Sequence, residues 1–374
     1  MRILLAFDSF KGSLSSEDVG EAFAAGWQSV RPDDSIDIVP IADGGEGTME
    51  AMSKALGGKL CNALVSDPLG RSVEAAYGYV ESEGVAIVDT ASASGLTLLS
   101  SSERNPLLAT SYGTGEIIAA AIRRGCRRIY LGLGGSATND GGMGLLRALG
   151  YRFYDASGEE LMGCGRDLSR VSRIDASQRM SGLNDVTFIV ASDVDNPLYG
   201  ERGAAYVYGR QKGGDDDAIS LLDAGLRNYA LAVEAYTGHD FAHFAGAGAA
   251  GGIGFALIAL LGATLRSGID TLLDMLHFDE RVAACDLVVT GEGRIDRQTL
   301  MGKAPSGVLR RATQQGRVAI AVGGGVAWCD ELRDGGFAAI YAATPEGQPL
   351  EEAMRSDIAK ENVRRIASHI AQSY

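Results

Sequence analysis

The sequence has little of several features that define common protein classes. Its five cysteines are odd in number, widely spaced and free of any CxxC pair, so a disulfide framework is not expected. Its four histidines are too few and too scattered for a metal cluster or a Ser/His/Asp triad. Serine hydrolases and zinc hydrolases are therefore disfavoured. Unpaired thiols are typical of a reducing compartment, which predicts a cytoplasmic protein.

Long hydrophobic runs and basic clusters are also scarce. The apolar stretch in MRILLAFDSF is too short for the core of a signal peptide and predicts a first strand instead. The uncharged segment 247–265 has transmembrane length, but its glycine-rich first half predicts a loop followed by a ten-residue buried helix. The net charge of −14, without a stripe of Lys and Arg, argues against binding to nucleic acid. No membrane or nucleic-acid partner is expected.

Two common nucleotide-binding fingerprints are missing. The chain contains neither the GxxxxGK[ST] spacing of a P-loop nor the GxGxxG turn of a dinucleotide fold. A nicotinamide-dependent dehydrogenase would show GxGxxG after the first strand, with an acidic residue about twenty positions later. Here the first turn reads DSFKGS. Any triphosphate site must therefore be of another type.

Periodic segments predict an α/β fold built from both ends of the chain. Short β-branched runs alternate with helical patterns, which is typical of βα units that form a mainly parallel sheet. After the first strand, Ser15 and Asp18 stand in capping-box spacing before a helix, and a second helix is expected over 46–56. The predicted strands of this sheet are 2–7, 36–41, 287–290, 318–322 and 338–342, followed by one long amphipathic helix through Leu350 and Ile370.

The middle of the chain interrupts this winding. The runs 75–80 and 85–89 are separated by a short turn and predict an antiparallel hairpin. We therefore expect a flavodoxin-like, doubly wound parallel sheet from residues 1–60 and 271–374, and an inserted second α/β domain over 61–270. The active site is expected in the cleft between them.

Glycine is abundant, at 51 residues, and it clusters after the predicted strands. Ligands bind at the carboxyl ends of strands in such sheets, so these clusters indicate binding loops. The loop after the first strand combines Ser9 and Lys11 with a helix N-terminus, which predicts an anion site. After the second strand, Asp43 and Gly44 begin a similar turn; an N-cap aspartate without a binding role is the alternative.

Three further clusters carry polar and charged residues. The stretch 130–144, a glycine-bounded run ahead of a helix, is the strongest candidate for a phosphate cradle, through Ser136, Thr138, Asn139 and Asp140. In the second cluster, Asp193 and Asp195 end a strand and precede Arg210 and Lys212, a combination that suits Mg²⁺ and phosphate together. The third contains Glu292, Arg294, Asp296, Thr299 and Lys303. Such a set of groups is typical of Mg²⁺-assisted phosphoryl transfer.

At these same segments the sequence resembles the glycerate kinase type-1 family. The motifs that carry the resemblance, in order, are DSFKGSLS, PIADGGEGT, SDPLGR, TSYGTGE, GGSATNDGG, SDVDNPL, QKGG, GAGAAGG and TGEGRIDRQT. The resemblance implies an ATP-dependent phosphotransferase that acts on the alcohol group of D-glycerate, with a flavodoxin-like domain joined to a second α/β domain. The implied product is 2-phosphoglycerate, with 3-phosphoglycerate as the alternative. Either a monomer or a homodimer is compatible with these motifs.

The motifs suggest a role for several individual residues. Asp193, or failing that Asp296, is expected to accept the proton of the substrate hydroxyl, because in-line attack needs a carboxylate within hydrogen-bond reach. Glu292, with Asp43 or Asp193, is the candidate for contact with Mg²⁺. Lys11, Arg71 and Arg294 are candidates to hold carboxylate or phosphate oxygens. A binding or regulatory protein for sugar acids that has lost the chemistry is the rival hypothesis.

Overall fold

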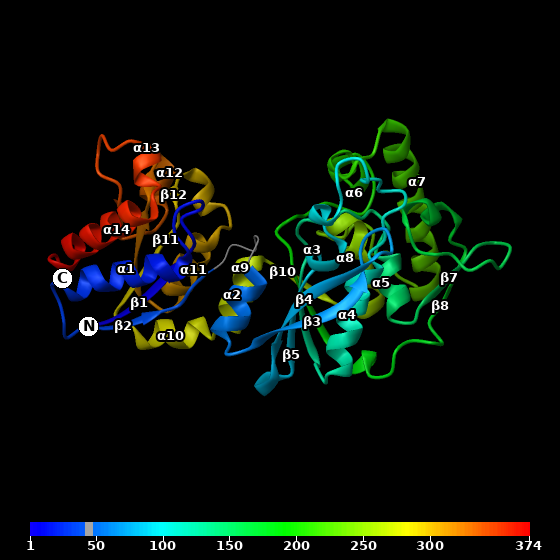
Figure 1. The fold of residues 1–374 in the computed structure, drawn as a ribbon, viewed down its shortest axis with the longest axis horizontal. Coiled ribbons are helices and arrows are strands. Elements are labelled where there is room, and N and C mark those ends of the chain that lie inside the picture. Colours follow the sequence, from blue (N-terminus) through cyan, green and yellow to red (C-terminus); the bar gives the residue numbers. More distant parts are fainter. Residues whose placement is uncertain (42–47) are drawn as a thin grey trace. The chain divides into compact units, whose positions relative to one another are not determined.

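The computed structural model describes residues 1–41 and 48–374 and divides into two compact units. Unit 1 comprises Met1–Leu56 and Ile269–Tyr374, and unit 2 comprises Gly57–Gly268. Figure 1 shows that strands and helices alternate in both units. The cleft expected between the two units stays a prediction.

Unit 1 is built on a five-stranded parallel sheet. Its strands have the order β15-β13-β11-β1-β2, and each neighbouring pair is parallel. Counted along the unit this order is 2-1-3-4-5, the flavodoxin-like winding, so the predicted fold class is confirmed. The strands are β1 (Arg2–Phe7), β2 (Ser35–Ile38), β11 (Leu287–Gly291), β13 (Val318–Gly323) and β15 (Ala339–Ala342).

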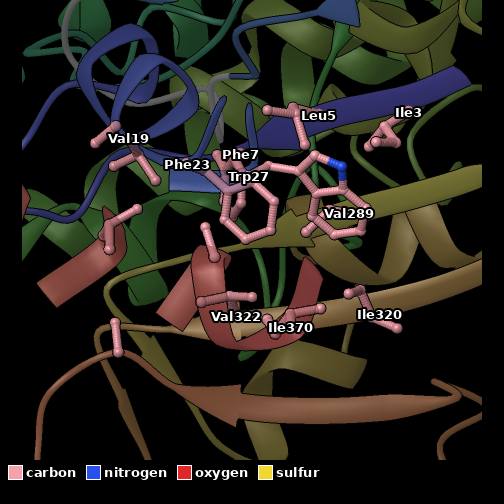
Figure 2. Close-up of a cluster of buried hydrophobic side chains, with 14 of the residues drawn as sticks. Ile3, Leu5, Phe7, Val19, Phe23, Trp27, Val289, Ile320, Val322 and Ile370 are labelled. Carbon is pink, nitrogen blue, oxygen red and sulfur yellow. The ribbon is translucent and has the colours of Figure 1, made fainter. Parts of the chain in front are cut away.

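Helices cover both faces of this sheet. On one face, α1 (Ser16–Gln28) and α14 (Ser356–Ala371) lie side by side and pack on Ile3, Leu5 and Phe7. Figure 2 shows Phe23 and Trp27 of α1 close to Phe7 in this cluster (Figure 2). Alternate residues of a strand point to opposite faces, so the other face is left for a second layer. There α11 (Ala304–Gln314) contacts β11 and β13, beside α10 (Phe278–Ala284).

The C-terminal helix differs from the sequence-based expectation. The single helix predicted through Leu350 and Ile370 is wrong, because the chain forms α13 (Leu350–Ala353) and α14 with Arg355 extended between them at ψ 132°. Leu350 is 74% exposed, so it does not continue the core-facing stripe of α14. The apolar periodicity that suggested one helix therefore joins residues with two different surroundings.

Unit 2 is built on a mixed six-stranded sheet of order β10-β9-β6-β5-β4-β3. The strands β5, β6, β9 and β10 are parallel, while β4 is antiparallel to both of its neighbours. The predicted hairpin is thus confirmed as β4 and β5. The strands are β3 (Lys59–Ser66), β4 (Ser72–Val80), β5 (Val85–Asp89), β6 (Arg128–Gly132), β9 (Thr187–Ala191) and β10 (Thr264–Arg266).

The principal helices of unit 2 are α3 (Ala91–Ser94), α4 (Tyr112–Arg123), α5 (Met143–Ala148), α6 (Ala204–Tyr208), α7 (Asp216–Thr237) and α8 (Ala249–Leu261). In α8, Ala250, Gly251 and Gly252 have left-handed backbones and regular helix follows them, as the glycine-loop prediction expected. Within 1–41 and 48–374, no helix has both the length and the apolar composition needed to cross a membrane.

The remaining elements are short. In unit 1 they are α2 (Thr48–Ala55), α12 (Asp330–Asp334), β12 (Arg294–Ile295) and β14 (Gly325–Val326), and α9 (Gly268–Met275) begins where unit 2 ends. In unit 2 they are β7 (Arg152–Tyr154) and β8 (Arg173–Asp175), which pair with each other. The pair β12 and β14 continues the chain beyond β11 and β13, so it lies at the carboxyl edge of the unit 1 sheet.

Candidate active site

The loop after β1 is tightly closed and presents Lys11 to solvent. Asp8 is buried, and its carboxylate accepts a hydrogen bond from the Ser9 amide at 2.7 Å. The Phe10 amide donates to the Leu14 carbonyl at 2.9 Å, and the Leu14 amide donates back to the Phe10 carbonyl at 3.0 Å. The helix α1 then starts on the Ser15 cap, whose hydroxyl accepts from the Asp18 amide. Predicted residues Ser9 and Lys11 thus lie at the carboxyl edge of the sheet.

The loop after β11 holds Glu292 in an ion pair. Glu292 is 8% exposed, and its carboxylate accepts hydrogen bonds from the Thr299 hydroxyl at 2.6 Å and the Lys303 ammonium at 3.1 Å. The Asp296 amide donates to the same Thr299 hydroxyl at 3.0 Å. Each Glu292 oxygen thus already accepts one hydrogen bond. Its predicted role toward Mg²⁺ stays a prediction.

Asp296 and Arg294 differ in how strongly the fold holds them. Asp296 is the N-cap of the short helix Arg297–Leu300, and its carboxylate accepts from the Gln298 amide at 2.8 Å. The Arg294 side chain is 74% exposed, and its nearest charge partner among the described residues is Asp296 at 4.0 Å. Arg294 is therefore available to an anion, whereas part of the Asp296 carboxylate stabilises a helix end.

These loops surround a cavity of about 310 Å³ in unit 1. Its lining comes from the segments that follow β1, β11, β13 and β15, and from α13 and the start of α14. The lining residues are Phe10, Lys11, Ser13, Gly293, Arg294, Gly324, Gly325, Ala343, Thr344, Gln348, Leu350, Ala353, Met354, Ala359 and Asn362. Two predicted cations, Lys11 and Arg294, are among them. The cavity is at the carboxyl edge, where ligands bind in open α/β sheets.

The predicted residues of unit 2 also gather at one edge of their sheet. Because β4 is antiparallel to β3 and to β5, β3 ends at the same edge as β5, β6 and β9. Arg71 follows β3, Ser136 follows β6, and Asp193 follows β9. The carboxyl ends of the strands thus carry the predicted residues in this unit as well.

Asp140 is buried at the centre of this edge. Its carboxylate accepts from the Ser111 amide at 2.7 Å, the Ser111 hydroxyl at 2.8 Å, and the amides of Gly142 at 3.0 Å and Gly144 at 3.2 Å. Burial raises the pKa of Asp140, and the hydrogen bonds from Ser111 and the two glycines oppose that rise. The carboxylate ties α4 to the glycine loop before α5.

Lys212 is a second buried charge centre of unit 2. It is 2% exposed, and its ammonium donates to the Ser136 hydroxyl at 2.9 Å and to the Thr138 carbonyl at 2.7 Å. Burial lowers the pKa of Lys212 to about 7, and the charge of Asp140 opposes this change. The sequence grouped Lys212 with Asp193, but these hydrogen bonds join it to the 136–140 loop. Arg210 pairs with Asp216 on the surface.

Several polar atoms beside this loop are buried without hydrogen-bond partners in the described structure. They are the Thr138 hydroxyl, both amide atoms of Asn139, and the Tyr229 hydroxyl. Thr138, Asn139 and Tyr229 are each 0% exposed. The predicted cradle residues are therefore brought together, but their side chains face the interior of unit 2. Their binding of phosphate stays a prediction.

Asp193 and Arg71 are accessible, and each is held by neighbours. Asp193 is exposed, and its carboxylate accepts from the Gly268 amide at 3.0 Å. A Cβ at position 268 would approach the other Asp193 oxygen to 3.3 Å, so a larger residue there would crowd that oxygen. Arg71 forms ion pairs of 2.6 Å with both Asp67 and Glu103. Two further predicted residues, Asp43 and Gly44, lie outside the described residues.

Sequence reasoning missed Ser111, Tyr229, Gln348 and Asn362. Ser111 lies in the TSYGTGE segment and begins a helix, which is a readable signal for a capping or binding role. Tyr229 lies on the buried side of α7, where nothing in the sequence separates it from an ordinary core aromatic. Gln348 and Asn362 line the unit 1 cavity, but they come from segments that carry no glycine motif. Among the described residues, no cluster of His, Cys, Asp or Glu could by itself hold a metal ion.

Taken together, fold and loops define a class of two-unit α/β proteins that carry cations and carboxylates at the carboxyl ends of their strands. Comparison with known proteins gives the family. The model of the glycerate kinase family matches residues 3–374, and the chain belongs to this family.

Relatives match over the whole length. The glycerate kinase of Bacillus cereus is 43% identical over 99% of this chain and 97% of its own. The glycerate 2-kinase of Escherichia coli K12 is 41% identical over 99% of this chain and 97% of its own. A crystal structure described as glycerate kinase 2 from Salmonella typhimurium LT2 superposes with a TM-score of 0.90 at 41% identity and covers 100% of this chain and 98% of that one.

Proposed function

We propose that this protein transfers the γ-phosphoryl group of ATP to a hydroxyl of D-glycerate, with 2-phosphoglycerate as the favoured product and 3-phosphoglycerate as the alternative. The observation that carries the proposal is the 41% identity, over 99% of this chain, to a relative named glycerate 2-kinase. The geometry supports it, because phosphoryl transfer needs positioned cations and a carboxylate rather than covalent chemistry. A cytoplasmic location accompanies this proposal.

Asp193 is the better candidate for the group that accepts the hydroxyl proton. One of its oxygens accepts from the Gly268 amide, so the carboxylate is oriented, and the side chain is exposed to solvent. Asp296 is the weaker candidate, because its carboxylate caps a helix. In the proposed step the substrate oxygen bonds to the γ-phosphorus, the bond to the bridging oxygen of ADP breaks, and the proton passes to Asp193.

The predicted cations differ in their surroundings. Lys11 and Arg294 line the unit 1 cavity and would hold phosphate oxygens through charge-assisted hydrogen bonds. Arg71 would reach the glycerate carboxylate only by sharing its guanidinium with Asp67 and Glu103. Lys212 acts through the 136–140 loop, which it holds from inside.

The exposed carboxylate of Asp193 is a suitable ligand for Mg²⁺. At nucleotide sites this ion binds one or two protein carboxylates together with substrate phosphates. Glu292 is the other predicted contact, through water, since its own oxygens already accept from Thr299 and Lys303. The ion would neutralise charge on the β- and γ-phosphates.

A phosphorus NMR time course of the purified protein with Mg·ATP and D-glycerate tests the proposal. Growth of ADP and 2-phosphoglycerate would support both the activity and its position. Growth of 3-phosphoglycerate would support the kinase activity but show that the other hydroxyl of glycerate is phosphorylated. Folded protein that forms no phosphoester, while a parallel sample without glycerate behaves identically, would contradict the proposal.

A further inference from the structure

The cavity of unit 1 has a composition that glycerate does not explain. It measures about 310 Å³, at the small end of ligand pockets. Much of its lining is apolar: Phe10, Leu350 and Met354, with Ala343 and Ala353. Glycerate carries an oxygen on each of its three carbons, so an apolar wall would not stabilise it. This wall indicates a ligand with an apolar face.

Two of the apolar side chains are exposed for no reason of core packing. Leu350 is 74% exposed and Met354 is 39% exposed, although both lie on short, otherwise polar segments. Phe10, on the opposite strand-end loop, is only 4% exposed, so it forms a fixed part of the wall. Exposed apolar residues gathered around a cavity mark a binding surface.

The lining also provides polar groups, one of which lacks a partner among the described residues. The Ser13 hydroxyl is buried and has no hydrogen-bond partner in the part of the chain that the structure describes. Asn362, which is 7% exposed, donates its amide N–H to the Gln348 side-chain oxygen at 2.8 Å. This bond leaves the Asn362 oxygen as an acceptor on the cavity lining. Unpaired buried polar groups are costly, so a ligand that satisfies them gains affinity.

Positive charge lies on the lining beside this apolar wall. Lys11 and Arg294 both line the cavity, and Arg294 is 74% exposed at its side chain. A ligand that matches all three features has a flat ring with apolar faces, an amino group on its edge, hydroxyls and an anionic tail. An adenine nucleotide has this chemistry.

We propose that this cavity binds the adenosine part of the phosphoryl donor, with the base against Phe10, Leu350 and Met354 and the phosphates toward Lys11 and Arg294. The Asn362 oxygen accepts from the amino group of the base, and the Ser13 hydroxyl pairs with a ribose or phosphate oxygen. This assignment deepens the proposed function and rests on it, because it presumes that the donor is a nucleotide.

A filling mutation tests the assignment directly. Gly325 lines the cavity, a Cβ there would meet nothing within 4 Å, and its backbone is not left-handed, so a larger side chain is compatible with the fold. We expect Gly325→Leu to raise the Kd of the imido analogue of Mg·ATP at least tenfold by isothermal titration calorimetry. Leu350→Asp, which removes apolar surface and adds a negative charge at a 74% exposed position, should weaken binding by about the same factor.

The matched control is Leu231→Asp on α7 of unit 2. Leu231 is 61% exposed and does not line the cavity, so its substitution should leave the Kd unchanged. Photolabelling of the wild-type chain with 8-azido-ATP should place the label on peptides that cover 343–362. Wild-type Kd values in both cavity variants, or a label confined to other peptides, would overturn the assignment.

The same variants separate this assignment from the proposed activity. If the wild-type protein makes phosphoglycerate but Gly325→Leu and Leu350→Asp keep their KM for ATP, the nucleotide binds elsewhere and the activity stands. If the analogue binds in the cavity and no phosphoglycerate forms, the assignment of the nucleotide site is supported and the proposed activity is contradicted.

Discussion

The carboxyl edges of the two sheets look alike in sequence and differ in structure. In unit 1, glycine loops leave a cavity with an apolar wall, Lys11 and an exposed Arg294. In unit 2, the glycine loop before α5 is filled from within by Asp140 and Lys212, which are hydrogen-bonded and buried. Clusters of glycine and polar residues can therefore have two structural roles. Some leave space for a ligand, and others allow backbone segments to pack closely.

The glycines themselves make this difference concrete. A Cβ at Gly144 of unit 2 would come within 2.1 Å of the Thr110 hydroxyl, and one at Gly251 within 2.0 Å of the Thr138 carbonyl. A Cβ at Gly325 of unit 1 would meet nothing within 4 Å. Gly144 and Gly251 are needed because their backbones closely approach other segments, whereas at Gly325 the absent side chain leaves the cavity open.

The largest effect is expected at the exposed acid of unit 2, Asp193. Replacing Asp193 by Asn keeps the hydrogen bond from the Gly268 amide but removes the proton acceptor, so kcat should fall about 100-fold or more. The fold should be unchanged, because the side chain is exposed. Steady-state kinetics with D-glycerate and Mg·ATP measures this loss.

Asp195→Asn is the matched control for that variant. Asp195 lies two residues further along the same loop, is also exposed, and contacts Arg202 at 3.4 Å. Its turnover should stay within about threefold of wild type, since exposed ion pairs contribute little. If both variants lose activity equally, loop charge rather than Asp193 itself is responsible. Near-normal turnover in Asp193→Asn would remove that residue from the mechanism and leave Asp296 as the candidate base.

Next in size is a pH effect confined to unit 2. The folded pKa of Lys212 is lowered to about 7, whereas an unfolded lysine titrates near about 10.4. Between these values the unfolded chain holds a proton that the folded chain lacks, so stability should rise with pH, by about 2 kcal/mol from pH 7 to about pH 9. Lys212→Met should abolish this rise.

Hydrogen exchange at several pH values, followed by mass spectrometry of peptides over 130–145, measures this change in local stability. Wild-type protection, corrected for the intrinsic pH dependence of exchange, should increase with pH more than that of Lys212→Met. A comparison of Lys303→Met with wild type is the control, because Lys303 is in unit 1 and its side chain is 36% exposed. Equal slopes in wild type and Lys212→Met would mean that Lys212 keeps an ordinary pKa.

Unit 1 should show a pH dependence of the same sign in a lower pH range, through Asp34. Its carboxylate accepts from Arg31 at 2.6 Å, from the chain N-terminus at 2.6 Å and from Trp27 at 3.0 Å. The hydrogen bond from Arg31, followed by that from the N-terminus, holds the pKa of Asp34 well below its usual range. Its stabilising contribution is therefore present above about pH 4 and is lost as pH falls through the folded pKa.

Asp34→Ala should lower the free energy of unfolding by about 1–3 kcal/mol at neutral pH, because the buried Trp27 N–H loses its acceptor. Both tryptophans, Trp27 and Trp328, lie in unit 1, so urea unfolding followed by tryptophan fluorescence reports on this unit. The difference from wild type should shrink as pH falls below about 4. A difference that stays constant with pH would contradict the charged role of Asp34.

The sequence predicted the unit 1 sheet well because three of its strands, β1, β11 and β13, are almost wholly buried apolar runs. All five were expected, and their order follows from the handedness of βα winding. The strand β3 was not predicted, because Leu60 at 42% and Leu64 at 77% exposure break the pattern of a buried strand. The helix break at Arg355 was hidden because Leu350 and Met354 keep helical spacing while lining a cavity.

The sequence predicted which residues lie near the candidate site, but it did not predict which of them are buried or what they contact. Motif position placed Lys11, Arg294 and Asp193 at strand ends, because parallel strands end at one edge. No pattern indicated that Lys212 would be 2% exposed and bonded to Thr138, since that depends on a contact 74 residues apart. Side-chain burial at a loop follows from tertiary packing, which local sequence does not encode.

The smallest predicted effect concerns Tyr229, whose hydroxyl is buried without a partner among the described residues. Its ring packs against Phe153 and Phe255, with centroids 5.9 Å and 5.6 Å away, so the aromatic contacts would survive in phenylalanine. Removing an unpaired buried hydroxyl also removes its desolvation cost, so Tyr229→Phe should leave stability unchanged or raise it by up to about 1 kcal/mol. Thermal unfolding followed by far-UV circular dichroism measures the change.

Tyr151→Phe is the contrasting variant, because the Tyr151 hydroxyl donates to the Leu260 carbonyl at 2.9 Å and its loss should destabilise unit 2 by about 1 kcal/mol. If Tyr229→Phe destabilised the protein as much as Tyr151→Phe, the Tyr229 hydroxyl would have a partner such as a buried water, and the interior of unit 2 would be better satisfied than its side chains alone indicate.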